Sequence, residues 1–231
     1  DRLRSRGLGD VYKRQVLKEG ETLGFDGRVV SVGEGEGYAA IAGKKNAKVN
    51  YQVDLIDEIW EDRPVLSEEP AFNLDVKYAG ETVASKLARI REEMKEAGTN
   101  VHVVSTIDDI CWTLNIRGND IDFFPLVLSY GIITMDSFEL YIDEKKLDDK
   151  LKAKLAKDGV NLHPYNDIYE DVKKFGSDVV AMIDPGKLNY ALFNNIPENV
   201  KTVEKRNPAI LMKAIKNPVE IENIRCLLYT S

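Results

Sequence analysis

The chain has 231 residues, of which 43% are hydrophobic and 31% are charged, and its formal net charge is -7 at pH 7. This length allows one large domain or two small ones with buried cores, and no apolar run approaches the roughly 18 residues of a transmembrane helix. The acidic balance excludes a general nucleic-acid or anionic-membrane binder. Because Cys111 and Cys226 cannot build a disulfide framework, we expect a cytoplasmic protein.

Both ends of the chain differ in character from the middle. Residues 1–15 are rich in arginine and glycine without a period, and they lack the apolar core of a signal peptide. Residues 226–231 read CLLYTS and do not continue the pattern before them. We therefore expect 1–15 and 226–231 to be non-native flanks, and we derive the fold from residues 16–225.

Residues 16–62 form the first part of the chain. In order, the patterns predict a strand at 22–26, a helix beginning after Asp26, a strand at 48–54 and a helical turn at 55–60. The glycines of SVGEGEG fit neither a dinucleotide fingerprint nor a P-loop. They indicate a surface helix weakened by glycine rather than a phosphate site.

Residues 63–79 contain two prolines, several acids and little periodicity, which predicts a linker. A clear helix follows, because apolar residues recur every three or four positions from Val83 to Ala97 and Gly98 stands where a C′ residue belongs. Thr106 is expected to cap the next helix.

Residues 80–215 alternate strand and helix patterns around one hairpin. The expected elements after the first helix are a strand at 101–105, a helix at 106–114, a hairpin of 125–135 and 138–142, a helix at 143–159, a strand at 161–165, a helix at 166–176, a strand at 179–184, a helix after Pro185 and a strand at 202–204. This order predicts an α/β fold, a three-layer domain with a mixed sheet.

Most reactive side chains have a structural explanation. His102 lies within an apolar strand and His163 precedes a proline, and neither has a second ligand at metal-binding spacing. Cys111 stands beside Trp112 in an apolar helix, which favours a core residue over a nucleophile. The acid pairs at 108–109 and 148–149 fall near helix starts, where carboxylates are favoured.

The segment TLNIRGNDIDFFPL is neither core nor simple loop. Asn115, Arg117 and Asp120 form its polar part, between a tryptophan-bearing helix and the next strand. A guanidinium between apolar elements usually has carboxylate partners. Arg117 is therefore a candidate for stabilising its own loop, for making an interdomain contact, or for contacting substrate directly.

Four stretches resemble the three-domain Xaa-Pro aminopeptidases of the creatinase and prolidase superfamily. They are NYQVDLIDEIWEDRP, KYAGETVASKLARIREEMKEAG, TIDDICWTLNIRGNDIDFFPLVLSYGIITMD and MKAIKNPVEIENIR. The resemblance implies that 16–62 is the end of a first creatinase N-terminal-like domain and 80–215 a complete second one, both related to ribonuclease H architecture. It also implies that 216–225 starts a third, catalytic domain, so that the helix beginning at Asn217 leads into a domain beyond this chain. The sequence departs from the family pattern at 122–124.

The resemblance implies an enzyme that removes an N-terminal residue from peptides with proline at the second position. Such an enzyme uses two divalent metal ions, usually manganese, held by two aspartates, a histidine and two glutamates of the third domain, and it acts as a homodimer. We therefore expect no catalytic residue, no metal ligand and no cofactor in this chain, and no activity of the chain alone. A non-catalytic interaction module and a fragment of another creatinase- or prolidase-type hydrolase remain as alternatives.

Overall fold

The computed structural model describes residues 16–230, so the predicted flank 1–15 and Ser231 lie outside the described residues. Contacts divide the chain into two compact units. The first unit is the chain up to Pro64 together with Pro185–Asn194, and the second is Val65–Asp184 with the chain from Asn195 onward. Pro185–Asn194 thus packs with the first unit, although it lies within the range 80–215 expected for the second domain.

The described part of the first unit contains a two-stranded parallel ladder and the helices α2 (Val32–Gly43) and α8 (Tyr190–Asn194). Strand β1 (Thr22–Gly24) pairs with β2 (Lys48–Asn50), and both are shorter than predicted. Helix α2 (Val32–Gly43) confirms the glycine-weakened helix, but it begins at Val32 rather than after Asp26. Ser31 and Glu34 set this start through a reciprocal capping box, in which each side chain accepts a hydrogen bond from the backbone N–H of the other.

Helix α8 (Tyr190–Asn194) packs closely on α2 within the first unit. A Cβ atom at Gly35 would lie 2.2 Å from the Tyr190 ring, so only glycine allows this approach. The Tyr190 ring also meets the Tyr51 ring edge-on at a centroid distance of 5.0 Å. Gly35 therefore allows α8 to pack closely on α2.

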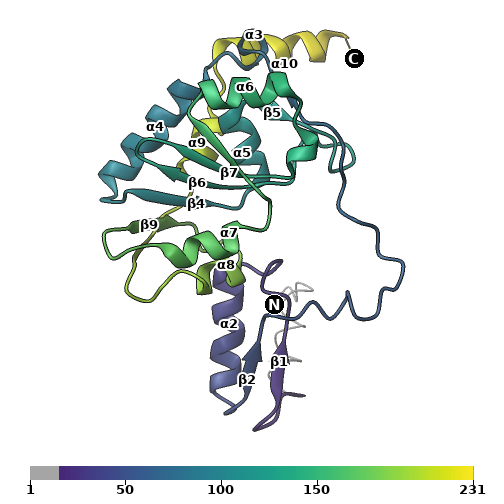
Figure 1. Ribbon diagram of the computed structural model, residues 1–231, viewed down its shortest axis with the longest axis vertical. Coiled ribbons are helices and arrows are strands. Elements are labelled where there is room, and N and C mark those ends of the chain that lie inside the picture. Colours follow the sequence, from purple (N-terminus) through teal and green to yellow (C-terminus); the bar gives the residue numbers. More distant parts are fainter. Residues whose placement is uncertain (1–15, 231) are drawn as a thin grey trace. The chain divides into compact units, whose positions relative to one another are not determined.

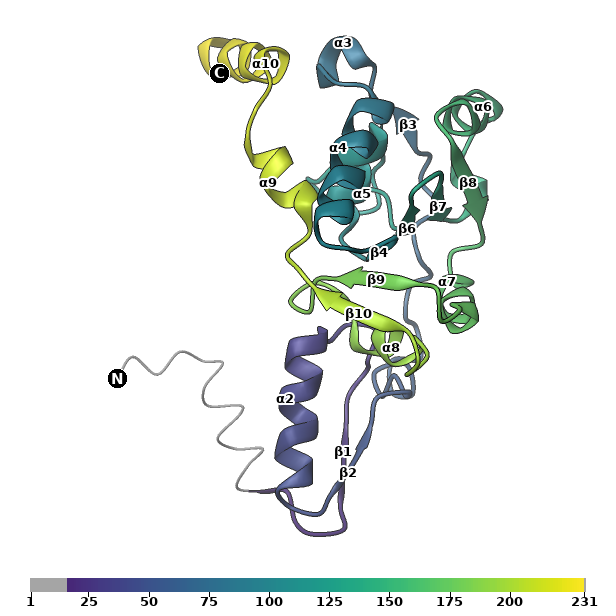
Figure 2. The same ribbon diagram turned by 90° about the vertical axis from the view of Figure 1, so that its left-hand side faces the viewer.

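The second unit contains a six-stranded mixed sheet, whose strands lie in the order β10-β9-β4-β6-β7-β8 (Figures 1 and 2). Its strands are β4 (Val101–Val104), β6 (Tyr130–Thr134), β7 (Phe138–Tyr141), β8 (Val160–His163), β9 (Val180–Ile183) and β10 (Lys201–Glu204). The β4–β6 and β6–β7 pairs are antiparallel, and the β10–β9, β9–β4 and β7–β8 pairs are parallel. The predicted hairpin and mixed sheet are confirmed.

Helices cover both faces of this sheet. Figures 1 and 2 show α4 (Val83–Glu96), α5 (Ile107–Leu114) and α9 (Pro208–Ala214) on one face and α7 (Ile168–Asp171) on the other, which gives the three predicted layers. The main core joins the apolar stripe of α4 to the sheet, through residues such as Leu87, Ile90, Met94, Ile133, Phe138 and Leu140. Thr82 caps α4, and Gly98 has the left-handed φ expected after its end.

Four segments differ from the sequence-based prediction. The expected linker contains β3 (Phe72–Asn73), which pairs with β5 (Ile116–Arg117), and α3 (Val76–Ala79). The helix expected at 143–159 divides into a 3-10 turn η1 (Glu144–Lys146) and α6 (Asp149–Lys157). The helix expected at 166–176 divides into α7 and a 3-10 turn η2 (Val172–Lys174), and α9 was not anticipated.

The last helix, α10 (Pro218–Thr230), starts where the sequence predicts. Asn217 Oδ1 accepts from Glu220 N at 3.0 Å, and Glu220 Oε2 accepts from Asn217 N at 2.9 Å. Asn223 Nδ2 donates to Tyr78 O at 3.0 Å, so α10 packs against α3. None of the helices between residues 16 and 230 combines the length and apolarity needed to cross a membrane.

Candidate functional site

Asn115 organises the loop that follows α5. It ends the helix in the left-handed conformation, with φ 53° and ψ 40°, and its side chain is buried. Its Oδ1 accepts from Lys86 Nζ at 2.7 Å, and its Nδ2 donates to Glu81 O at 2.9 Å. Its backbone carbonyl accepts from Leu74 N at 2.8 Å. Asn115 thus joins the end of α5 to α4 and to the segment before it.

Lys86 lies on the apolar face of α4 and is only 1% exposed. Besides Asn115, its ammonium donates to Trp112 O at 2.7 Å and lies 4.3 Å from the centroid of the Trp112 ring. Burial lowers the pKa of Lys86 to about 8, and the carboxylates of Glu81 and Glu220 oppose this effect. With this pKa Lys86 is mostly charged at neutral pH, although no carboxylate in the described chain bonds to it.

Arg117 folds back on the end of α5. Its Nη1 donates to Cys111 O and to Ile116 O, both at 2.8 Å. Burial lowers the pKa of Arg117, which stays charged because a guanidinium does not lose its proton in proteins. Among residues 16–230, no group accepts a hydrogen bond from its Nε or Nη2. The edge of the guanidinium that binds carboxylates side-on is thus open.

Three cations gather at the carboxyl end of α5. Lys86 and Arg117 bond to carbonyls there, and Lys154 Nζ donates to Leu114 O at 3.0 Å. The last carbonyls of a helix lack partners within the helix and carry partial negative charge, so cations stabilise this end. The cluster fixes the loop from 115 to 120 in place.

Asp120 belongs to a separate charge pair. Its Oδ2 accepts from Leu128 N at 2.7 Å and from Lys146 Nζ at 2.5 Å, and both charged side chains are almost wholly buried. Its Oδ1 is buried and has no hydrogen-bond partner in the described chain. Asp120 therefore connects the loop to η1 rather than to Arg117.

The three predicted residues do not converge on one point. Asn115 and Arg117 share the end of α5, whereas Asp120 pairs with Lys146. Sequence reasoning missed both lysines. The burial of Lys86 could have been predicted, since this lysine interrupts the apolar stripe of α4 one position before Leu87. Nothing in the amino-acid sequence distinguishes the buried Lys146 from the exposed Lys145.

His102 lies at the centre of a buried polar network. Its Nδ1 contacts Met182 O at 3.0 Å and its Nε2 contacts Asn207 Oδ1 at 3.2 Å, and burial lowers its pKa. Asn207 Nδ2 also donates to Asp109 Oδ2 at 2.9 Å, and Asp109 Oδ1 accepts from Lys213 Nζ at 2.7 Å. The network joins β4, α5 and α9, which is a structural role for this histidine.

Cys111 and His163 also have contacts within the fold. Cys111 is buried, and burial raises the pKa of its thiol, which opposes formation of the thiolate. His163 Nε2 lies 2.6 Å from Glu139 Oε2 and its ring stacks on Tyr141. Between residues 16 and 230, no three histidine, cysteine or acidic side chains come together as a metal site. The described residues therefore do not fit a dinuclear metal centre.

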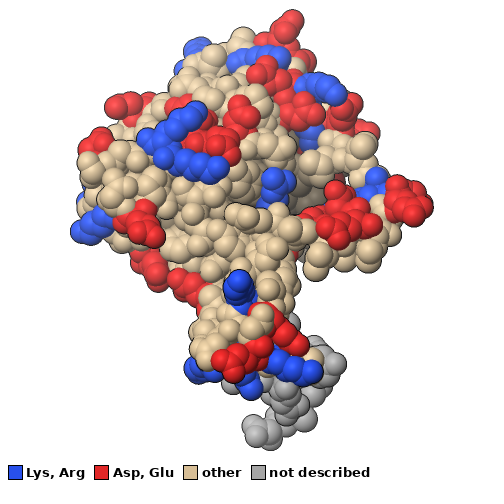
Figure 3. Space-filling view, turned by 60° about the horizontal axis from the view of Figure 1, so that its bottom comes forward, with Lys and Arg blue, Asp and Glu red and all other residues tan. Residues whose placement is uncertain are grey.

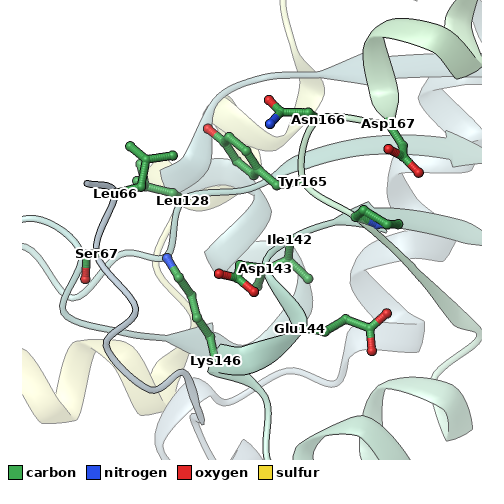
Figure 4. Close-up of a pocket in the computed structure, with 11 residues that line it drawn as sticks. Leu66, Ser67, Leu128, Ile142, Asp143, Glu144, Lys146, Tyr165, Asn166 and Asp167 are labelled. Carbon is green, nitrogen blue, oxygen red and sulfur yellow. The ribbon is translucent and has the colours of Figure 1, made fainter.

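Two surface features complete the description. On the face shown in Figure 3, basic and acidic side chains are interspersed. A pocket of about 480 Å³ opens in the second unit between the segment at 66–67, the loop at 142–146 and the loop at 164–167 (Figure 4). Lys146 lines this pocket, so the buried ion pair between Lys146 and Asp120 lies next to it.

Comparison with known proteins relates this architecture to one family. The Creatinase/Prolidase N-terminal domain family matches residues 62–220. The chain is 34% identical over 225 residues to a probable Xaa-Pro aminopeptidase P of Sordaria macrospora, covering 89% of this chain and 36% of that relative. It is 35% identical to Xaa-Pro aminopeptidase 1 of Dictyostelium discoideum, covering 90% and 34%.

A solved structure agrees with these relatives. The X-prolyl aminopeptidase of Caenorhabditis elegans, described as a cytosolic enzyme with a di-nuclear active site, superposes with a TM-score of 0.87 at 29% identity, over 94% of this chain and 36% of that one. The chain thus spans about a third of the length of the relatives it matches. By its sequence match and its mixed sheet, the chain belongs to the Creatinase/Prolidase N-terminal domain family.

Proposed function

We propose that this chain is the N-terminal, non-catalytic portion of an Xaa-Pro aminopeptidase. The parent enzyme would hydrolyse the bond between an N-terminal residue and a following proline. One observation carries the proposal: the similarity runs along 94% of this chain but only 36% of the Caenorhabditis elegans enzyme. The described residues also lack a cluster of metal ligands, so the chemistry would lie in the remainder of the parent.

The parent would use two divalent metal ions, for which we propose manganese. Its neighbour's di-nuclear active site supports the number of ions. When bound, such ions polarise a carbonyl and lower the pKa of a bound water. Because the described residues do not hold them, this chain would shape the surroundings of the catalytic domain instead. We further propose that the parent acts in the cytoplasm as a homodimer.

Within the parent, we propose that 16–62 ends a first domain, 80–215 forms a second and 216–225 begins the catalytic domain. The contacts at the start of α10 support this arrangement. Asn217 Nδ2 donates to Ala79 O at 2.8 Å. The negative charge of Glu220 raises the pKa of Lys86 and of Arg117, which favours their charged forms. The open edge of Arg117 would then meet a carboxylate of the following domain, while Asn115 and Asp120 position the loop.

The activity can be tested on the chain itself. Incubated with manganese and a peptide that has proline at its second position, the chain should release no N-terminal residue, whereas the Caenorhabditis elegans enzyme under the same conditions should. Release by the purified chain that a chelator abolishes would show that it holds its own metal centre and would refute the proposal.

A further inference from the structure

The pocket in the second unit has an apolar part of defined size. Leu66, Leu128, Ile142 and Pro164 line it, and its volume of about 480 Å³ lies within the range of small-molecule sites. The wall at 66–67 is fixed to the opposite side by two contacts. Lys145 Nζ bonds to Glu68 Oε1 at 2.5 Å, and Ala71 N donates to Lys146 O at 2.9 Å. The pocket can therefore receive an aliphatic side chain without a large movement of this wall.

Lys146 gives the pocket a buried cation. Its side chain is 2% exposed and has one hydrogen-bond partner in the described chain, Asp120 Oδ2. An ammonium has three N–H donors, so two of them have no partner in the described chain. In Figure 4 the amine of Lys146 stands between Ser67 and Asp143. A carboxylate of a ligand is the group that best matches a desolvated ammonium with open donors.

Carboxylates outnumber cations around the rest of the pocket. Asp143, Glu144 and Asp167 line it, and Figure 4 shows Glu144 and Asp167 on the side away from Lys146. Glu144 pairs with Lys152 at 3.3 Å, whereas no group between residues 16 and 230 bonds to the Asp167 carboxylate. This excess of negative charge favours a ligand that carries an ammonium as well as a carboxylate.

We propose that this pocket binds a free α-amino acid with an aliphatic side chain. Its α-carboxylate accepts from Lys146, its α-ammonium donates to Asp143, and its side chain packs against Leu128 and Ile142. Binding of this ligand does not depend on the proposed parent activity. The pocket gives this domain a ligand of its own.

The test is an NMR titration of the ¹⁵N-labelled chain with L-leucine. Saturable shifts are expected for amides of 142–146 and 164–167. L-leucinamide lacks the carboxylate and 4-methylpentanoate lacks the ammonium, so each should bind about tenfold more weakly or worse, as for the loss of one charge-assisted hydrogen bond. No saturable shift with L-leucine, or equal affinity of either analogue, would overturn the proposal.

Variants test the protein side of the same contacts. Asp143→Asn should weaken the binding of L-leucine by about tenfold. Asp136→Asn, at the exposed β6–β7 turn, is the control and should leave the affinity unchanged. Removing Lys146 would leave the Asp120 carboxylate buried without its cation and could unfold the domain, so its role is tested through the ligand analogues. Equal affinity of wild type, Asp143→Asn and Asp136→Asn for L-leucine would exclude the proposed ammonium site.

Discussion

Gly80 allows the close contact between the end of α3 and the residue that caps α10. Its φ is +72°, and a Cβ atom there would lie 2.2 Å from Asn217 Oδ1. Gly98 has a similar φ of +68° but nothing within 4 Å of such an atom. The pair of glycines therefore separates the effect of backbone conformation from the effect of the contact.

Gly80→Ala should lower the free energy of unfolding by about 2–4 kcal/mol, because a left-handed conformation and an overpacked contact add. Gly98→Ala should cost only about 1 kcal/mol, for the conformation alone. Denaturant titration of both variants measures the difference. Equal losses would mean that the Gly80–Asn217 contact contributes nothing.

Lys86 makes stability depend on pH in the alkaline range. Its pKa in the folded protein is about 8, against 10.5 for an ordinary lysine side chain. Between these values the unfolded chain binds the proton and the folded chain does not, so stability rises with pH across this window. Below pH 8 both states are charged and the full cost of burial is present. At about 1.4 kcal/mol per pKa unit, the gain reaches about 3 kcal/mol.

The Lys86 effect is isolated by comparison with Lys86→Met, which keeps most of the length of the side chain and removes the titrating group. The difference in unfolding free energy between wild type and variant should grow in favour of wild type from pH 8 to pH 10.5. Other titrating groups cancel in this difference. A difference that does not change with pH would show that Lys86 keeps an ordinary pKa.

At the scale of elements, the two asparagines that cap Asn-Pro helix starts should contribute differently to the free energy of unfolding. Asn217 caps α10 and reaches Ala79 O. Asn207 caps α9 through Ala209 N, and it is also buried against His102 and Asp109. Asn207→Ala should therefore lower the unfolding free energy by about 2–4 kcal/mol and Asn217→Ala by about 1 kcal/mol. Denaturant midpoints check this order, and a larger loss at Asn217 would contradict it.

Elements with a long apolar period or a strong cap could be predicted from the sequence. The four-three spacing from Val83 onward gave α4, and the box at Asn217 gave the start of α10. Short elements could not, because their stability comes from distant partners. β3 has two residues and forms only against β5, and α9 has seven residues with few polar positions.

Competing local signals explain the divided helix at 143–159. Asp143 accepts from Lys145 N and starts η1, and Asp148 accepts from Leu151 N at 2.7 Å and starts α6. Leu147 between them is extended, with φ -105° and ψ 119°. Two caps five residues apart cannot both lie inside one helix, which the leucine spacing alone concealed.

The candidate site was predictable as a segment but not as a set of contacts. The polar run from Asn115 to Asp120 stood out between apolar elements. Its partners Lys86 and Lys146 lie 29 and 26 residues away from Asn115 and Asp120, and only the fold brings them together. The roles of Arg117, Asn115 and Asp120 in the longer protein remain proposals.

At the scale of the whole molecule, the two units should differ in stability. The first holds a small apolar cluster around Leu17, Ile41 and Ala42, whereas the core of the second spans its sheet and helices. Native-state hydrogen exchange should therefore show strong protection for β4 and β9 and weak protection for β1 and β2. Equal protection in both units would contradict this division.

Large apolar side chains on α9, at its C-cap and on α10 are exposed to solvent. Leu211 is 62% exposed, Ile215 68% and Ile224 44%. Exposed apolar surface of this kind marks interaction sites in soluble proteins. It supports the proposal that a further domain packs here in the parent enzyme.

The most direct test of that proposal is to recover the coding DNA beyond codon 225 from the source sample, express the extended protein and assay it on an Xaa-Pro peptide with manganese. The account predicts that the frame continues into a domain with two aspartates, a histidine and two glutamates as metal ligands, and that only the extended protein cleaves the peptide. A frame that ends at Ser231, or an extended protein without this activity, would contradict it.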